Sequence, residues 1–174
     1  MKLLYTSAQI HTRIAELGEQ ISKDYEAQSV LVLGVLKGCA IFISHLLVQL
    51  KGDFEIDFMA VSSYGSGTAS GEIQLQKEPS SSVAGKTVLL VEDIVDSGKT
   101  VSFVKNYLLK KGAASVEIVT FVDKETETNV LNPKYVGFKY NDPAFLVGFG
   151  FDLAEKYRNL PEVYQLELQD LKTE

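Results

Sequence analysis

The chain has 174 residues, 45% of them hydrophobic and 23% charged, which is the composition of one ordinary globular domain. Its formal net charge of −6 and its sequence pI near 5.0 argue against broad, non-specific nucleic-acid binding, which requires a basic surface. The single cysteine, Cys39, excludes an intrachain disulfide, and together with His11 and His45 it is too small a set for a zinc site of the usual kind.

The N-terminal segment, residues 1–21, soon becomes charged and helical in period, so we expect no signal peptide there. No apolar run approaches the roughly 18 residues that a membrane span requires. With a lone cysteine and no secretory start, we expect a cytoplasmic protein.

The first predicted element is an amphipathic helix at 7–27, with apolar side chains at helical spacing and Ser7 as its N-cap. A continuous, β-branched run at 29–36 then predicts a strand that is buried on both faces. The remaining predicted elements, in chain order, are a helix at 39–50 that ends near Gly52, strands at 54–64 and 85–92, a helix at 99–112, a strand at 115–124, and short strands at 134–140, 145–152 and 161–168.

Strands that alternate with helices predict an α/β domain with a mostly parallel sheet. Ligands of such sheets bind at the carboxyl ends of the strands. Three polar segments fall there: "LKG" at 36–38, "EDIVDSGKT" at 92–100 and "DK" at 123–124. We therefore expect these segments to form a site.

The segment 62–71, "SSYGSGTASG", is rich in Gly and Ser and follows a strand. Its ordinary interpretation is a hairpin connection, and its functional interpretation is an active-site lid. Composition alone favours the connection.

The turn "DSGKT" at 96–100 invites comparison with the Walker A loop, but Asp93 stands where that motif requires glycine. The turn still links a strand end to a helix start, where free backbone N–H groups favour an anion. Gly98 permits close backbone approach, and Ser97 and Thr100 offer hydroxyl donors. The alternative is a plain helix cap, which these five residues alone favour.

Glu92 and Asp93 change that balance, because they end a buried strand and a helix cap does not need them. Two adjacent carboxylates can accept hydrogen bonds from vicinal hydroxyls, directly or through the hydration shell of Mg²⁺. Ribose carries such a pair of hydroxyls. A phosphate turn beside the two acids therefore predicts a ribose 5-phosphate site.

On these residues the chain resembles the type I phosphoribosyltransferases and, among them, the hypoxanthine-guanine branch. The segments that carry the resemblance span about residues 29–165 in the family's order: "VLGVLKGCAIFISHLL", "VSSYGSGTASGEIQL", "VLLVEDIVDSGKT", "TFVDKE" and "FLVGFGFDLAEKYRNLPEVY". The resemblance implies one domain over 1–174, with a core of mostly parallel sheet and flanking helices at about 25–140. It also implies a small hood from the N-terminal residues and about 141–174, and a mobile lid at about 62–75.

The resemblance further implies a pentosyltransferase of purine salvage. Such an enzyme uses Mg²⁺ to transfer the 5-phosphoribosyl group of phosphoribosyl pyrophosphate to a 6-oxopurine, hypoxanthine or guanine. The products are IMP or GMP and pyrophosphate. A homodimer or homotetramer is expected, with no membrane or nucleic-acid partner.

The roles that the resemblance implies for individual residues fall into two groups. Around the sugar and the phosphates, they are ribose and metal binding by Glu92 and Asp93, 5′-phosphate binding by Asp96, Ser97, Gly98, Lys99 and Thr100, and pyrophosphate binding by Arg158 and by Lys37 and Gly38, with a non-proline cis peptide before Lys37. Around the base, Asp96 would transfer a proton near N7 of the purine, and Lys124 would bond its O6. Phe145 would stack on the purine, Leu146 would contact it through backbone groups, and Asp152 would face a second Mg²⁺ on the base side. The lid would begin at Ser63 and Tyr64.

Taken singly, these residues have ordinary alternatives. Lys37 and Arg158 would suit a solvated surface, Phe145 would suit a core, and Asp152 would cap a helix at 153–160. Together and in this order they favour the site.

Two departures from the family pattern stand out. Many bacterial members carry two arginines shortly after the lysine that corresponds to Lys124, where this chain has Thr126 and Thr128. The segment 139–145, "KYNDPAF", replaces a common "IPDKF". Two rival functions remain open: a regulator that binds RNA, against which the net charge counts, and a scaffold with a vestigial site, against which the intact acids count.

Overall fold

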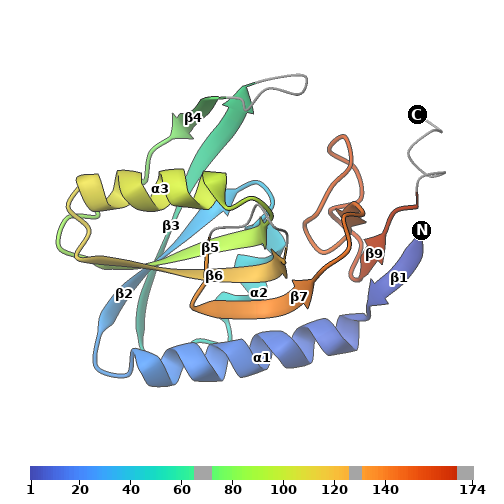
Figure 1. Ribbon diagram of the computed structural model, residues 1–174. Coiled ribbons are helices and arrows are strands. Elements are labelled where there is room, and N and C mark those ends of the chain that lie inside the picture. Colours follow the sequence, from blue (N-terminus) through green and yellow to red (C-terminus); the bar gives the residue numbers. More distant parts are fainter. Residues whose placement is uncertain (65–71, 126–130, 168–174) are drawn as a thin grey trace.

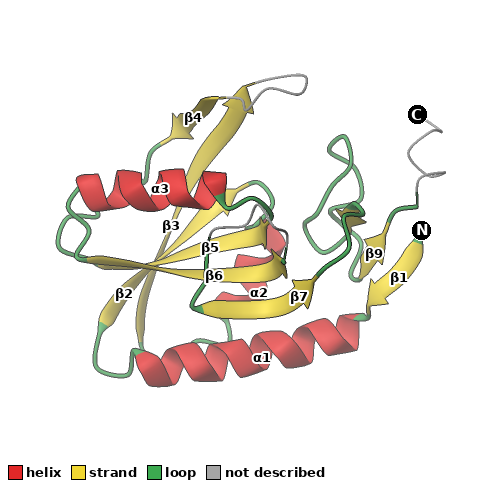
Figure 2. Ribbon diagram, viewed as in Figure 1, coloured by secondary structure: helices red, strands yellow, loops and turns green. Residues whose placement is uncertain are grey.

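The computed structural model describes residues 1–64, 72–125 and 131–167 (Figure 1). In chain order the elements are β1 (Lys2–Tyr5), α1 (Ser7–Asp24), β2 (Ser29–Leu36), α2 (Ala40–Leu47), β3 (Asp53–Tyr64), β4 (Glu72–Lys77), β5 (Thr87–Val95), α3 (Lys99–Lys110), β6 (Ser115–Lys124), β7 (Tyr135–Tyr140), β8 (Leu146–Val147) and β9 (Val163–Gln165). Figure 2 shows how the helices and strands alternate along the core.

The central sheet has six strands in the order β4-β3-β2-β5-β6-β7. All neighbours are parallel except β3 and β4, which form an antiparallel pair. The predicted α/β fold with a mostly parallel sheet is confirmed.

Helices cover both faces of this sheet, as the alternation within β2 shows. Val30 and Val32 pack in a core with α1 and α2, whereas Leu31 and Leu33 pack in a second core with α3. Successive side chains of a strand point to opposite faces, so a strand between two helical layers must be apolar throughout. This is why residues 29–36 read as a continuous hydrophobic run.

The chain leaves the middle of the sheet in two directions. From β2 it passes through α2 to β3, and from β5 it passes through α3 to β6, on the other side. The neighbouring strands β2 and β5 therefore form the topological switch point, where α/β sheets bind ligands at their carboxyl ends. The loops 37–39 and 96–98 emerge side by side there.

A second, three-stranded sheet in the order β1-β9-β8 joins the two ends of the chain. β1 pairs antiparallel with β9, for example Lys2 with Gln165, and β9 pairs with β8. Figure 1 shows this sheet beyond the arrowheads of β5, β6 and β7, on the ligand-binding side of the core. We call this sheet, with the loop 148–162 between β8 and β9, the hood.

The first helix begins one residue earlier than the predicted cap implies. Thr6, not Ser7, is the N-cap: its hydroxyl accepts from the N–H of Gln9 at 3.3 Å, and Gln9 Oε1 accepts from the N–H of Thr6 at 2.9 Å. This reciprocal arrangement is a capping box, which satisfies two otherwise unpaired donors. The prediction of Ser7 as the cap was therefore wrong.

The third predicted strand extends further than expected. β5 runs to Val95, so Glu92 and Asp93 lie inside the strand rather than at its end. Glu92 pairs in register with Thr120 of β6. The acids are thus held by a rigid parallel ladder, three residues before the phosphate turn.

Segments 145–152 and 153–160 are less regular than predicted. Only Leu146–Val147 is strand in the first. In the second, Ala154, Glu155 and Tyr157 have φ values of 50°, 65° and 75°, which excludes a right-handed helix. The alternative role of Asp152 as the cap of such a helix is therefore wrong.

No helix in the described part of the chain is both long and apolar enough to span a membrane.

Candidate active site

The phosphate turn after β5 forms as predicted. Gly98 has a φ of 72° and precedes the first residue of α3, and Ser97 Oγ lies 3.5 Å from the N–H of Lys99. Gly98 has no side chain to cap the helix, and only the long contact of Lys99 N–H with Ser97 Oγ is recorded at its first turn, so this end of α3 suits an anion. A cavity of about 220 Å³ lies over this turn, lined by Glu92, Ile94, Val95, Asp96, Ser97, Gly98, Lys99, Thr100 and Val101.

The two acids of β5 are Glu92, which lines this cavity, and its neighbour Asp93. Glu92 is 8% exposed, and no described residue bonds to its Oε2. Burial raises the pKa of Glu92 well above its usual range, and the neighbouring charge of Asp93 raises it further. Burial also raises the pKa of Asp93, to about 6, although the N–H of Ile94 donates to Oδ1 at 2.9 Å. A buried acceptor without a donor is expected where a ligand supplies the missing partner.

The loop after β2 meets these acids. The Leu36–Lys37 peptide is cis, as the resemblance implies. Gly38 packs directly on the carboxylate of Asp93, so a Cβ at this position would overlap it. A side chain at Gly150 would likewise overlap the carbonyl oxygen of Gly38. Glycine at 38 and 150 thus lets the first loop, the acids and the hood approach one another closely.

A second cavity, of about 230 Å³, lies between this loop, the acids and the hood. Its lining comprises Val35, Leu36, Gly38, Val61, Ser62, Ile73, Glu92, Asp93, Thr100, Asp152 and Arg158. Glu92 and Thr100 line both cavities. The two cavities therefore adjoin across the acid pair.

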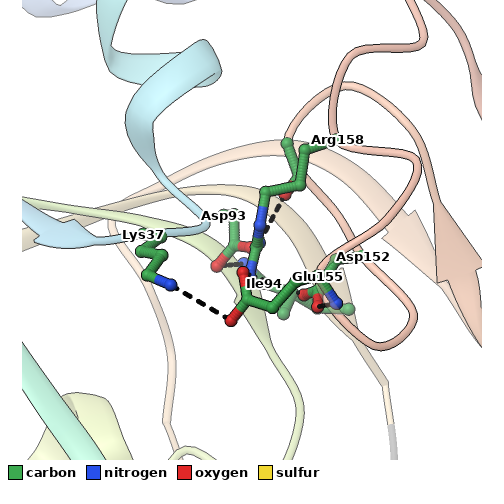
Figure 3. A network of polar contacts seen from close by, with 7 residues as sticks. Lys37, Asp93, Ile94, Asp152, Glu155 and Arg158 are labelled. Atoms are coloured by element: carbon green, nitrogen blue, oxygen red, sulfur yellow. Dashed lines mark hydrogen bonds and ion pairs between the residues drawn. The ribbon is translucent and has the colours of Figure 1, made fainter.

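The hood supplies the cation of this second cavity. Arg158 donates from Nη1 to the carbonyl of Gly150 at 2.7 Å, and its Nη2 lies 2.9 Å from Asp152 Oδ1 (Figure 3). Glu155 connects this group to the core, because its Oε1 lies 3.2 Å from Lys37 Nζ and its Oε2 lies 3.3 Å from Arg158 Nη2. The predicted pyrophosphate residues are thus brought together.

The predicted base residues gather at the end of β6. Lys124 is 8% exposed, and its Nζ donates to the carbonyl of Ala144 at 3.3 Å and lies 3.8 Å from Asp96 Oδ2. Phe145, next to Ala144, is 55% exposed. Leu146 is buried in β8, with its backbone in register with Gln165. An exposed aromatic ring, next in the chain to the carbonyl that Lys124 contacts, suits a flat, polar ligand.

The residues expected to begin the lid lie at the end of β3, beside the edge strand β4. Ser63 and Tyr64 are the last residues of β3, opposite Ile73 and Glu72 of β4. The strand at 72–77 was not predicted, and part of it falls within the expected lid at 62–75. Residues 65–71, like Thr126 and Thr128, lie outside the described residues.

Magnesium fits this site only together with a ligand. Among the described residues, no three Asp, Glu, His or Cys side chains are placed to hold a metal ion alone. The unpartnered Oε2 of Glu92 and the nearby carboxylates of Asp93 and Asp152 are nevertheless oxygen donors of the kind that Mg²⁺ prefers. Mg²⁺ commonly binds through one or two carboxylates, with waters and substrate phosphates completing the shell.

Two residues of the site were not identified from the sequence. Glu155 bridges Lys37 and Arg158, and Gly150 admits the backbone of Gly38. Neither belongs to a local pattern with a recognisable spacing, because Lys37 and Gly38, which they contact in the core, lie more than 100 residues away along the chain. The run "GFG" at 148–150 was the one available signal of a close approach.

Comparisons with known proteins agree with this geometry. A family model described as "Phosphoribosyl transferase domain" matches residues 3–156. The chain is 41% identical over 165 residues to the hypoxanthine-guanine phosphoribosyltransferase of Streptococcus pyogenes serotype M3, covering 93% of this chain and 91% of that protein. The chain is also 43% identical over 164 residues to the bifunctional protein TilS/HprT of Listeria innocua. That match covers 93% of this chain but only 25% of the length of the relative.

Solved structures give the same result. A hypoxanthine phosphoribosyltransferase from Staphylococcus aureus superposes with a TM-score of 0.91 at 40% identity, over 97% of this chain and 92% of that one. A ternary substrates complex of the hypoxanthine phosphoribosyltransferase from Trypanosoma cruzi superposes with a TM-score of 0.89 at 30% identity, over 98% of this chain and 97% of that one. This chain therefore belongs to the phosphoribosyltransferase family, in its hypoxanthine-guanine branch.

Proposed function

We propose that the protein is a purine-salvage enzyme that transfers the 5-phosphoribosyl group of phosphoribosyl pyrophosphate to hypoxanthine or guanine, with Mg²⁺ as its cofactor. One observation carries the proposal: two cavities adjoin at the acids of β5, and Glu92 and Thr100 line both. A substrate with phosphate at one end of a ribose and pyrophosphate at the other fits such a pair. The products are IMP or GMP and pyrophosphate.

In this proposal the turn 96–100 binds the 5′-phosphate through backbone N–H groups and hydroxyls. Glu92 and Asp93 accept hydrogen bonds from the ribose hydroxyls, which supplies the partner that Glu92 Oε2 lacks in the described residues. This holds C1 of the sugar between the leaving group and the base. Orientation of the reactants removes much of the entropic barrier to a reaction between two molecules.

Lys37 and Arg158 stabilise the negative charge that develops on pyrophosphate as the bond to C1 breaks. Glu92, Asp93 and Asp152 would hold Mg²⁺ with oxygens of the substrate, and the ion would add further positive charge at the leaving group. Asp96, exposed beside the base pocket, moves the proton at N7 of the purine. The lid excludes water from the reactive centre.

The base pocket favours 6-oxopurines. Lys124 is a buried cationic donor beside the exposed ring of Phe145. A lysine ammonium has no acceptor, so it bonds the carbonyl O6 of hypoxanthine or guanine and leaves the amino group of adenine unpaired. The proposal includes a cytoplasmic location and a homodimer or homotetramer; a buried, lone Cys39 is compatible with a reducing compartment.

Nucleotide formation tests the proposal directly. Hypoxanthine, guanine, xanthine, adenine and uracil are offered side by side with phosphoribosyl pyrophosphate and Mg²⁺. We expect turnover of one or more 6-oxopurines, none of adenine or uracil, and loss of activity with EDTA. Folded protein that turns over no base would overturn the proposal and direct attention to RNA binding.

A further inference from the structure

Glu155, a described acidic residue that contacts Arg158 of the second cavity, has no role in the resemblance or in the proposed reaction. Its carboxylate contacts both cations of the predicted pyrophosphate site, Lys37 Nζ at 3.2 Å and Arg158 Nη2 at 3.3 Å (Figure 3). The two cations come from opposite ends of the chain, one from the loop after β2 and one from the hood. A single carboxylate therefore bridges the core and the hood at the place where an anion is expected.

The loop around Glu155 holds its carboxylate in this place. Its φ is 65°, and its N–H donates to Asp152 Oδ2 at 2.8 Å. Asp152 in turn contacts Arg158 at 2.9 Å. The backbone is thus tied to the site independently of the side chain of Glu155, so a change confined to that side chain should leave the loop in position.

The two cations depend on Glu155 to different degrees. Arg158 is also held by the carbonyl of Gly150 at 2.7 Å and by Asp152, and its side chain is 25% exposed. Lys37 extends from an exposed loop, and its side chain is 70% exposed. Glu155 thus mainly sets the position of Lys37, which it holds on the hood side of the site.

We propose that Glu155 is a positioning residue that competes with pyrophosphate. Without that group its carboxylate pairs with Lys37 and Arg158, and a bound pyrophosphate displaces it from both. Glu155 therefore sets the affinity of the site for pyrophosphate. This inference rests on the proposed function for the identity of the anion. A carboxylate offers two acceptor oxygens to the same donors that a phosphate oxygen uses. Its negative charge also opposes the entry of a polyanion.

The expected effect is modest, because both ion pairs lie at the surface. Glu155 is 63% exposed, and exposed ion pairs contribute little individually. Removing two such contacts together with one nearby negative charge should tighten pyrophosphate binding about three- to tenfold at low salt. The gain should shrink as salt rises, since screening weakens exposed charge interactions.

The test compares Glu155→Gln with the unmodified protein. Gln keeps the shape of the side chain and removes its charge. Dissociation constants of pyrophosphate are measured by calorimetry with Mg²⁺ present, and KM values are measured for phosphoribosyl pyrophosphate and for the purine. We expect the pyrophosphate constant and the KM of phosphoribosyl pyrophosphate to fall together about three- to tenfold, with the KM of the purine unchanged. A purely structural role for Glu155 would instead move both KM values or neither.

Two further variants sharpen the test. Glu16→Gln removes the same charge from an exposed ion pair with Arg13 on α1, away from the site, and should leave pyrophosphate binding unchanged. In a Lys37→Met background, most of the effect of Glu155→Gln should disappear, because the contact to Lys37 is already absent. An equal effect in both backgrounds would show that Glu155 does not act through Lys37.

The outcomes separate this inference from the proposed function. Turnover of 6-oxopurines with unchanged or weakened pyrophosphate binding in Glu155→Gln would overturn the inference alone. Tighter pyrophosphate binding without turnover of any base would support the inference and overturn the proposed reaction. Failure of the unmodified protein to bind pyrophosphate would overturn both.

Discussion

At the scale of single residues, the base end of the site pairs two charges that arrive on different strands. Asp96 follows β5 and Lys124 ends β6, and their side chains lie 3.8 Å apart between Asp96 Oδ2 and Lys124 Nζ. Asp96 is 59% exposed in its side chain, whereas that of Lys124 is 10% exposed. In the proposed reaction the exposed acid is accessible to the substrate, and the buried cation would hold the base.

The first prediction concerns this acid. Asp96→Asn keeps the size of the side chain and removes its ability to take up a proton. We expect kcat to fall by at least about tenfold, because positioned acid–base groups typically contribute 10²–10⁴-fold. Both KM values should stay near those of the unmodified protein. Steady-state kinetics with hypoxanthine measure this, and an unchanged kcat would remove Asp96 from the role.

Lys124→Ala should separate the two substrates. A hydrogen bond to a charged group contributes about 1.5–3 kcal/mol, so the KM of a 6-oxopurine should rise roughly 10- to 150-fold. Binding of phosphoribosyl pyrophosphate, measured by calorimetry without a base, should be unchanged. Because Lys124 is buried, Lys124→Met serves as a control that fills the same space. Equal loss of both substrates in the two variants would mean that the lysine has a structural role.

The sequence predicted these residues because their patterns are local. Residues 92–100 combine acids, hydroxyls and glycine within one strand–turn–helix segment, and their grouping follows from covalent geometry. The contact of Glu155 with Lys37 has no such origin. It depends on how the hood folds over the core, and spacing along a single chain does not encode that arrangement.

At the scale of elements, α1 approaches the turn after α2 at a point where one glycine permits the contact. Gly18 is buried in α1, and a Cβ added there would overlap Cβ of Gln49, just beyond α2. Glycine inside a helix costs about 1 kcal/mol relative to alanine, so its presence here requires a packing reason. Close approach of the turn at Gln49 is that reason.

The third prediction concerns Gly18→Ala, a change that usually stabilises a helix but should destabilise this one. Gly18→Ala should lower the free energy of unfolding by about 1–3 kcal/mol, because overpacking outweighs the gain in helix propensity. The exposed neighbouring change Glu19→Ala should be neutral or slightly stabilising. Chemical denaturation of both variants measures the difference. A stabilised Gly18→Ala variant would show that α1 and the turn at Gln49 separate at little cost.

Strand β3 is tied to the β4–β5 connection by one carboxylate. Asp57 Oδ1 accepts from the N–H of Phe58 at 2.7 Å, and Oδ2 accepts from the N–H of Ser81 at 2.9 Å. Burial by itself raises the pKa of Asp57, but hydrogen bonds from the backbone of Ser81, Phe58 and Ser80 outweigh it and lower the pKa below its usual range. The folded protein therefore binds this proton less readily than the unfolded chain does.

A pH dependence follows from that shift. A carboxyl whose pKa is lowered by folding contributes stability that is complete above the unfolded value, about 3.9, and is lost as the pH falls through the folded value. Asp57→Asn should therefore lower the free energy of unfolding by about 1–3 kcal/mol at neutral pH. The difference from the unmodified protein should shrink below about pH 4. A difference that stays constant from pH 7 to pH 3 would contradict this account.

Element boundaries show where sequence patterns suffice. The bounds of β2 and β6 match the predicted 29–36 and 115–124. β2 is apolar after its first residue, as a strand buried on both faces requires. β6 carries several polar residues, but its β-branched residues still indicate a strand. β1 and β4 were not predicted, and β8 has only two residues where a strand at 145–152 was predicted. These short strands form only because a partner lies beside them: β1 pairs with β9 from the opposite end of the chain. Such pairing is a tertiary effect that local propensity does not show.

At the scale of the whole molecule, the proposed site is assembled from the central sheet and the hood, which share one core because Phe149 and Phe151 of the hood pack against Phe121 of β6. The loops after β2 and β5 belong to the central sheet, whereas Asp152 and Arg158 belong to the hood. At the site the two parts meet in the Gly38–Gly150 approach and the Lys37–Glu155 ion pair. A ligand that contacts both parts should therefore join them and stabilise the folded chain.

The last prediction measures that link. Phosphoribosyl pyrophosphate with Mg²⁺, at about 100 times its dissociation constant, should add about 2.7 kcal/mol to the free energy of unfolding. For a domain of this size that raises Tm by about 5–10 °C. Ribose 5-phosphate at the same concentration reaches the phosphate turn and the acids but lacks the pyrophosphate that contacts the hood, so its shift should be smaller. EDTA should reduce the first shift and leave that of ribose 5-phosphate less affected, because in the proposed site Mg²⁺ would be held jointly by the carboxylates and the pyrophosphate oxygens. Equal shifts with the two ligands would mean that the hood takes no part in binding and that Lys37 and Arg158 serve another purpose.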